Sequence, residues 1–267
     1  IKWVVPTFYI IFLMLPIYWL LNMSFKSTTE IINVYSLWPQ DFTLDNYKTI
    51  FTDSTWYMGY VNSITYTVFN TIISVSAALP AAYAFSRYKF LGDKHLFFWL
   101  LTNRMAPPAV FALPFFQFYS PINLFDTHIA IALSHCLFNI PLAVWILEGF
   151  MSAVPKELDE SAKVDGCTQF QAFRHVIIPV MWPGVITTGL FSFLLAYNDF
   201  AVTAMLLSEE NRTMVPQVAA FLGTTYTEGN IMFAVASVVS ATAPLFILVM
   251  FFQRQIVSGL TQGAVKG

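Results

Sequence analysis

The chain has 267 residues, of which 57% are hydrophobic and only 10% are charged, and its mean hydropathy is +0.63. A soluble domain carries about 25% charged residues, because it needs a surface that faces water. The composition therefore excludes an ordinary soluble protein and indicates a membrane protein. The net charge of −2 gives no sign of a nucleic-acid partner, and we expect none.

Six apolar stretches are long enough to cross the hydrocarbon core of a membrane, which takes about 20 helical residues. They are residues 4–22, 57–85, 96–118, 129–150, 184–206 and 231–252. These stretches are continuous, whereas a membrane β-barrel shows segments of about 10 residues with alternating polarity. The sequence therefore predicts an all-α polytopic membrane protein, with residues 1–267 forming a single transmembrane domain.

The first and third stretches carry additional signals. No small-residue cleavage site follows residues 4–22, so we expect a retained helix rather than a signal peptide. Because the sequence begins at Ile1 and not at Met, we expect residues to precede it. The third stretch contains Pro107, Pro108 and Pro114, and proline frees backbone carbonyls in a membrane helix. We therefore expect a kink there, of the kind that lines transport pathways.

Basic residues divide unequally between the two sets of connections. Nine lie on one side: Lys2, Arg87, Lys89, Lys94, Lys156, Lys163, Arg174, Arg254 and Lys266. Three lie on the other side, namely Lys26, Lys48 and Arg212, and the remaining one, Arg104, lies within a span. Because cytoplasmic loops carry an excess of Lys and Arg, this asymmetry predicts that both termini are cytoplasmic.

The connection formed by residues 151–183 is polar and well patterned, on the predicted cytoplasmic side. Pro155 is expected in the first turn of a helix, where its missing N–H is not needed, and three carboxylates then lie near the positive end of the helix dipole: Glu157, Asp159 and Glu160. Gly166 is expected to end this helix in a left-handed conformation. A second short helix would place three apolar side chains on one face: Phe170, Phe173 and Val176. The pattern fits a compact knob for a soluble partner, or an amphipathic loop that rests on lipid headgroups.

Part of this connection resembles the EAA signature of ABC importer permeases. The signature reads Glu-Ala-Ala, three residues, Gly, nine residues and Ile-x-Leu-Pro. Here Glu160-Ser-Ala-Lys-Val-Asp-Gly166 is followed, after nine residues, by Val176-Ile-Ile-Pro179. The matching positions are Glu160, Ala162, Asp165, Gly166 and Pro179. The departures, at Ser161, Val176 and Ile178, exchange small for small and aliphatic for aliphatic residues.

Three further stretches are similar to the carbohydrate-importer subfamily, which includes the maltose permease subunits. They are Arg104-Met-x-Pro-Pro108, Tyr197-Asn-Asp-Phe200, where the family usually has Trp in place of Tyr197, and the tail from Gly259 to Gly267. The resemblance covers most of the chain. It implies a permease fold, with residues 151–183 as a coupling loop. It also implies translocation of a small carbohydrate or polyol across a bacterial inner membrane.

The resemblance further implies a complex of several subunits. Its other members would be a second permease subunit, a dimer of ATP-binding subunits and an extracytoplasmic solute-binding protein. The coupling helix would sit in a cleft of the ATP-binding subunit, with Glu160 making the contact and Gly166 the turn. ATP and Mg would bind to the partner subunits, because this chain has no Gly-x-x-x-x-Gly-Lys-Ser/Thr loop. We expect the chain itself to bind no cofactor and to catalyse no reaction.

Charged and polar residues within membrane spans are usually paired or functional. Arg104 and Glu148 lie at similar predicted depth, so they could pair, or Arg104 could act in gating. Asn198 and Asp199 could bond to a neighbouring helix or contact the solute, and Asn139 is open to the same two interpretations. No cluster of His, Cys and carboxylate residues lies at one depth, so no metal site is expected.

Other functions stay open on the residues alone. An intramembrane enzyme needs a nucleophile and base, or metal ligands, that converge at one depth. A self-contained channel or secondary transporter would be favoured by internal repeats, and none is evident. Among importers, a permease for glycerol 3-phosphate is the alternative to one for neutral carbohydrates. Few cations lie on the predicted outer surface or in the spans, which argues against a phosphorylated solute.

Overall fold

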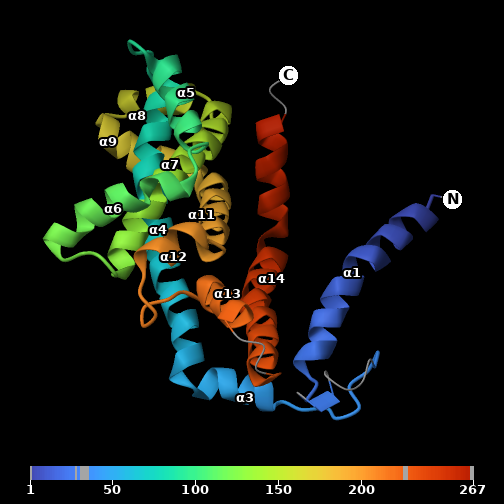
Figure 1. Cartoon of the computed structure of the whole chain (residues 1–267). Coiled ribbons are helices and arrows are strands. Elements are labelled where there is room, and N and C mark those ends of the chain that lie inside the picture. The colour runs from blue at the N-terminus through green and yellow to red at the C-terminus, as the bar shows by residue number, and fades with distance from the viewer. Residues whose placement is uncertain (1, 28, 31–35, 225–227, 265–267) are drawn as a thin grey trace. The chain divides into compact units, whose positions relative to one another are not determined.

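A computed structural model describes the chain except residues 1, 28, 31–35, 225–227 and 265–267, and it describes no side chains in 222–230 and 256–267. The described residues form helices, without a β-strand beyond an isolated bridge between Lys26 and Phe42. The predicted all-α class is therefore confirmed. The chain divides into two compact units, Ile1–Ser63 with Glu209–Ile247, and Ile64–Ser208 with Leu248–Gly267 (Figure 1).

The first unit has a small aromatic core. It contains α1 (Val4–Ser24), α3 (Asp45–Thr52), α13 (Met214–Thr224) and the first parts of α4 (Ser54–Arg87) and α14 (Glu228–Ala264). The ring of Trp56 stacks on Phe221 with centroids 4.1 Å apart, and Ile50 and Met214 are buried beside them. In contrast, the apolar stretch of α1 is 0% buried, an exposure that suits a helix surrounded by lipid.

A buried ion pair organises the connection after α1. Lys26 Nζ lies 3.8 Å from Glu30 Oε1 and donates a 2.6 Å hydrogen bond to the carbonyl of Ser36. The Ser36 hydroxyl and the backbone N–H groups of Gln40 and Asp41 donate to the Glu30 carboxylate. Burial alone would raise the pKa of Glu30, but these hydrogen bonds and the charge of Lys26 hold it below its ordinary value. The loop is therefore built around a carboxylate that stays ionised.

The second unit holds the predicted coupling loop. It contains the remaining parts of α4 and α14 and a series of shorter elements in chain order. They are α5 (Asp93–Asn103), η1 (Pro108–Phe111), α6 (Ala112–Tyr119), η2 (Ser120–Ile122), α7 (His128–Ala153), α8 (Glu157–Val164), α9 (Gln169–Ala172), η3 (Phe173–Ile177), α10 (Ile178–Val180), α11 (Trp182–Tyr197) and α12 (Ala201–Leu206). In Figure 1, α8 and α9 lie beside the C-terminal end of α4.

The third predicted span, residues 96–118, is not one continuous helix. The axis turns by 95° between Asp93–Asn103 and Pro108–Ile122. Pro107 has φ −65° and ψ 132°, an extended conformation. A residue before proline is pushed out of the helical region, and Pro108 follows Pro107 directly, so the helix must stop. The expected kink is thus a sharp break, with Arg104 at the end of α5.

The fifth predicted span, residues 184–206, is also interrupted. Helix α11 ends at Tyr197, and α12 begins at Ala201. The Asp199 carboxylate accepts hydrogen bonds from the backbone N–H groups of Val202 at 3.1 Å and Thr203 at 3.0 Å. The first N–H groups of a helix have no partner within the helix, and Asp199 supplies one. The carboxylate of Asp199 therefore caps the N-terminus of α12.

Four helices in the described part of the chain are long and apolar enough to cross a membrane: Val4–Ser24, Ser54–Arg87, His128–Ala153 and Ile231–Gln255. Two bent pairs, Asp93–Asn103 with Pro108–Ile122 and Gln169–Val180 with Trp182–Tyr197, raise the number to six if each pair counts as one span. These counts rest on length and composition. The number of six spans stays a prediction.

The close packing of α11 on α7 generates a stability prediction. A Cβ atom at Gly184 would lie 2.7 Å from Phe150 Cγ, so Gly184→Ala must displace the ring. Overpacking of this kind costs about 1–3 kcal/mol. We expect Gly184→Ala to lower the midpoint of thermal unfolding of the detergent-solubilised protein. The midpoint is measured by size-exclusion chromatography of samples heated to a series of temperatures. Gly149→Ala is the control, because a Cβ at Gly149 would meet nothing within 4 Å. Equal midpoints for the two variants would contradict the close approach.

Candidate functional site

The candidate site begins with α8, whose exposed side chains are mostly charged. Its first turn contains Glu157, Asp159 and Glu160, and its last turn contains Lys163. Carboxylates near the N-terminus and a cation near the C-terminus both interact favourably with the helix dipole. The helix begins two residues after Pro155, so this proline precedes the first turn and does not form part of it.

Gly166 ends α8 in the predicted left-handed conformation, with φ +88°. The N–H of Gly166 donates to the carbonyl of Lys163 at 3.0 Å, and the N–H of Cys167 donates to that of Ala162 at 2.9 Å. These two bonds form a Schellman motif, which satisfies carbonyls that the end of the helix leaves free. The chain therefore reverses within a few residues and in one defined geometry.

A second helical segment follows the glycine turn. Thr168 and Gln171 form a reciprocal capping box at the start of α9, with the Thr168 N–H donating to Gln171 Oε1 at 2.8 Å. The segment then passes through the π-helical turn η3 into α10, which contains Pro179. Proline has no N–H to continue the α-helical bonding pattern, so a wider turn precedes it. The expected second helix is present, with a π-helical middle.

The outer surface of the loop combines charge with exposed apolar side chains. Glu160 and Asp165 are exposed, as are Gly166 and Pro179. Val164 is 87% exposed and Phe170 is 67% exposed, although both are apolar. Ala162 is buried and faces inward. Thus one side of the loop packs on the protein, and the other presents a surface of charged and apolar side chains of a kind that partners often cover.

Asp159 is a functional candidate that sequence reasoning missed. It is 5% exposed, whereas Glu157 and Glu160 beside it are exposed. Its Oδ2 accepts a 2.7 Å bond from Arg87 Nε, and its Oδ1 accepts a 2.5 Å bond from the Tyr83 hydroxyl. One sequence signal existed, because Asp159 lies three residues before Ala162 and therefore shares its inward face.

Arg87, in the last turn of α4, bonds to α7 as well as to Asp159 of α8. Its Nη1 donates to the carbonyl of Met151 and its Nη2 to that of Val154, both at 3.1 Å. Both carbonyls belong to the C-terminal end of α7, where the last carbonyls have no α-helical partner, although that of Met151 also accepts from the N–H of Val154. The planar guanidinium has five donors in a fixed fork, which suits this simultaneous bonding.

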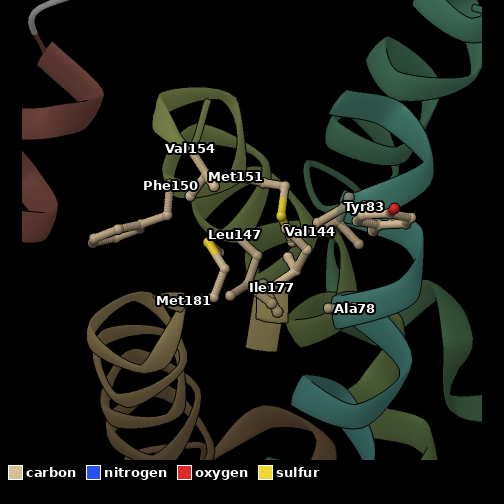
Figure 2. Packing of buried hydrophobic residues seen from close by; sticks show 11 residues of the cluster. Ala78, Tyr83, Val144, Leu147, Phe150, Met151, Val154, Ile177 and Met181 are labelled. Atoms are coloured by element: carbon tan, nitrogen blue, oxygen red, sulfur yellow. The ribbon is translucent and has the colours of Figure 1, made fainter. Parts of the chain in front are cut away.

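A buried apolar cluster packs between the same helices that make these polar contacts. Figure 2 shows the side chains of Val144, Leu147 and Met151 from α7 together with Ala78 and Tyr83 from α4 and Ile177 and Met181 from the loop region. Leu147, Met151 and Ile177 are each 0% exposed. Burying a side chain of this size contributes roughly 1.5–3 kcal/mol. The loop is thus attached to α4 and α7 by both packing and hydrogen bonds.

The polar residues proposed for the substrate pathway make different contacts. Asn139 is 1% exposed and donates to Asn70 Oδ1 at 2.6 Å and to the Ser192 carbonyl at 3.0 Å. Asp199 caps α12 and lies 3.7 Å from His135 Nε2. Asn198 is exposed and donates to the Leu194 carbonyl at 2.8 Å, within its own helix. Asn139 thus bonds to neighbouring helices, one of its two interpretations, whereas the hydrogen bonds of Asp199 go to the first turn of α12.

Arg104 and Glu148 do not form the ion pair that their predicted depths allowed. Arg104 is partly exposed at the break after α5, and Glu148 accepts a hydrogen bond from Ser152. The ion pairs of the described residues join other partners, with Arg87–Asp159 as the closest at 2.7 Å. The sharp bend at Pro107 explains the difference, because equal depth was inferred for a continuous helix. Within the described residues, no group of three His, Cys, Asp or Glu could hold a metal ion.

Comparisons with known proteins agree with this architecture. Residues 55–262 match the family described as "Binding-protein-dependent transport system inner membrane component". The chain is 34% identical to the trehalose transport system permease protein SugB of Mycobacterium tuberculosis, over 99% of this chain and 96% of that protein. It is also 34% identical to the diacetylchitobiose uptake system permease protein DasC of Streptomyces coelicolor, over 96% and 92% of the two chains.

A solved structure shares the fold. It is the crystal structure of a bacterial ABC transporter involved in the import of the acidic polysaccharide alginate. The TM-score is 0.75, with 21% sequence identity over 95% of this chain and 94% of that chain. The match supports the permease fold inferred from the EAA signature. The tail from Gly259 to Gly267 also contributed to that inference, and the structure does not describe its side chains. The chain is a multi-pass membrane protein and belongs to the family of inner-membrane components of binding-protein-dependent transport systems.

Proposed function

We propose that this chain forms one half of the transmembrane pathway of an ATP-driven importer for a neutral carbohydrate. The observation that carries the proposal is the loop of residues 151–183, whose helix, glycine turn and second helix present an exposed surface with Glu160, Val164 and Phe170. In an ABC importer such a loop couples the permease to an ATP-binding subunit. A rigid turn suits that role, because a flexible loop would absorb the movement it must transmit.

The proposal includes the partners and the orientation. The excess of basic residues in one set of connections supports a cytoplasmic position for the coupling loop and both termini. The pathway would be completed by a second permease subunit, and a dimer of ATP-binding subunits would bind ATP and Mg. A solute-binding protein would deliver the solute from outside; a related solved structure contains an alginate pentasaccharide-bound periplasmic protein.

The names of the more similar relatives support a neutral carbohydrate as the substrate class. Names of related permeases refer to trehalose, diacetylchitobiose and maltose, all of them neutral sugars. Arg104 lies at the break between α5 and η1, and Asn198 lies at the end of α11. We propose that these two residues face the solute. Asn139 and Asp199 would shape the pathway indirectly, since their polar groups already bond to the chain.

Uptake measurements test the proposed function. The chain is reconstituted into proteoliposomes with its second permease subunit and ATP-binding subunits, and the binding protein is added outside. We expect saturable, ATP-dependent uptake of radiolabelled trehalose or maltose, with little uptake of glycerol 3-phosphate. Preferential uptake of glycerol 3-phosphate would contradict the substrate class. Uptake that does not depend on ATP would contradict the importer itself.

Removing the proposed contact with the ATP-binding subunit tests the coupling loop. Glu160 is exposed, so Glu160→Ala should leave the membrane fold and its unfolding midpoint unchanged. We expect both uptake and ATP hydrolysis stimulated by the binding protein to fall about tenfold, as for an interfacial charge contact worth roughly 1.4 kcal/mol. Asp93→Ala is the control, because it removes a partly exposed carboxylate near the start of α5, outside the coupling loop. Normal uptake and stimulated hydrolysis in Glu160→Ala would refute the assignment.

The left-handed conformation at Gly166 provides a second test of the loop. A Cβ at this position would meet nothing within 4 Å, so any effect comes from the backbone φ of +88°. A residue with a side chain loses about 1–2 kcal/mol in this conformation, and Asn loses less. We expect stimulated ATP hydrolysis, measured in the purified complex, to decrease in the order wild type, Gly166→Asn and Gly166→Val. Equal activities of the two variants would show that the turn geometry is unimportant.

A further inference from the structure

The buried carboxylate of α8 faces the membrane domain, away from the surface proposed to contact the ATP-binding subunit. Asp159 is 5% exposed, whereas Glu157, Glu160 and Asp165 are exposed. Burial of an ionised carboxylate is unfavourable unless it is paired and hydrogen-bonded. Asp159 therefore serves a different purpose from its exposed neighbours, namely contact with the rest of this chain.

One turn of α4 supplies the partners of this carboxylate. Arg87 Nε lies 2.7 Å from Asp159 Oδ2, and the two side chains are 6% and 8% exposed. The Tyr83 hydroxyl, one turn earlier on α4, donates to Asp159 Oδ1 at 2.5 Å. Both carboxylate oxygens are thus bound by the same helix. We call Tyr83, Arg87 and Asp159 the latch.

The latch also reaches the segments on either side of α8. Arg87 donates through its two Nη atoms to the carbonyls of Met151 and Val154, at the end of α7. Gln169, the first residue of α9, donates to the Tyr83 hydroxyl. A single turn of α4 therefore holds the segment before the coupling helix, the coupling helix itself and the segment after it.

This arrangement opposes any sliding of α8 along α4. In a buried environment the attraction between Arg87 and Asp159 is little screened. If α8 moved while α4 stayed, both charges would lose their partners while still largely buried, which is strongly unfavourable. The two helices are therefore expected to move together. Tyr83 and Arg87 lie in the last turns of α4, after Pro80, so a displacement of α8 acts directly on this C-terminal part of the helix.

We propose that Asp159 and Arg87 are positioning residues that transmit the movement of the coupling helix to α4. The proposal rests on the proposed importer function. In this scheme Glu160 and the exposed apolar side chains receive the movement of the ATP-binding subunit. The latch then delivers it to a helix of the transport pathway. Without the latch, the ATP-binding subunits would still bind α8 and hydrolyse ATP, but α4 would follow incompletely.

The test measures uptake and ATP hydrolysis in the same proteoliposomes and compares their ratio. The main variant is Arg87→Gln with Asp159→Asn, which removes both charges and leaves no unpaired ion. The solute is the radiolabelled disaccharide, trehalose or maltose, that the unmodified complex takes up. We expect stimulated hydrolysis to stay within about twofold, while uptake per ATP falls about fivefold or more, the range of typical couplings between sites. Lys89→Ala is the control, because it removes an exposed cation two residues after Arg87.

Two further variants keep the test decisive. Tyr83→Phe keeps both charges and removes the hydroxyl that binds Asp159, so it replaces the main variant if that one does not assemble with its partners. Arg87→Lys keeps the charge but not the fork, and we expect a ratio between those of the wild type and the main variant. An unchanged ratio in an assembled latch variant would overturn the proposal while leaving the importer function intact. Absence of ATP-dependent uptake by the unmodified complex would instead contradict the importer function.

Discussion

Within a hydrocarbon core, each backbone N–H and C=O group needs a partner from the protein itself, and this constraint governs where the chain can interrupt its helices. The break after α11 illustrates it. Asp199 accepts from the N–H groups that begin α12, and the Tyr66 hydroxyl donates to the carbonyl of Ala196 at the end of α11. Each side of the break is therefore satisfied by a side chain. An interruption of this kind leaves few backbone groups without a partner.

The same constraint favours polar contacts between helices. Asn70 donates to the carbonyl of Ala132 at 2.8 Å, and Asn139 donates to Asn70 and to the carbonyl of Ser192. These bonds connect α4, α7 and α11 in the second unit. Each such bond contributes about 1 kcal/mol or less, so together they define the register of the helices more than they stabilise them. Small residues at Gly184 and Ala143 allow the close packing that the bonds require.

Local features of the fold could be predicted from the sequence, whereas contacts between distant segments could not. Gly166 was predicted to be left-handed, because a glycine after an amphipathic segment is a local signal. The partners of Asp159 were missed, because Arg87 lies 72 residues earlier and neither segment carries a local pattern that predicts contact with the other. The Arg104–Glu148 pair failed for a related reason. It assumed one continuous span, and the two consecutive prolines turn the chain by 95° just after Arg104. The EAA pattern indicated the family, because its residues and spacing can be read within one segment of the sequence.

The coupling loop has two faces with different chemistry, and this division explains its composition. Its inner face carries Ala162 and the buried carboxylate of Asp159, whose two oxygens are bonded to Tyr83 and Arg87 of α4. Its outer face carries Glu160, Val164 and Phe170, which are exposed in this chain. The buried ion pair and the rigid glycine turn support the proposed coupling role over a loop that rests on lipid headgroups. In that proposed role, a movement received on one face would reach the rest of the protein only if the other face is firmly attached.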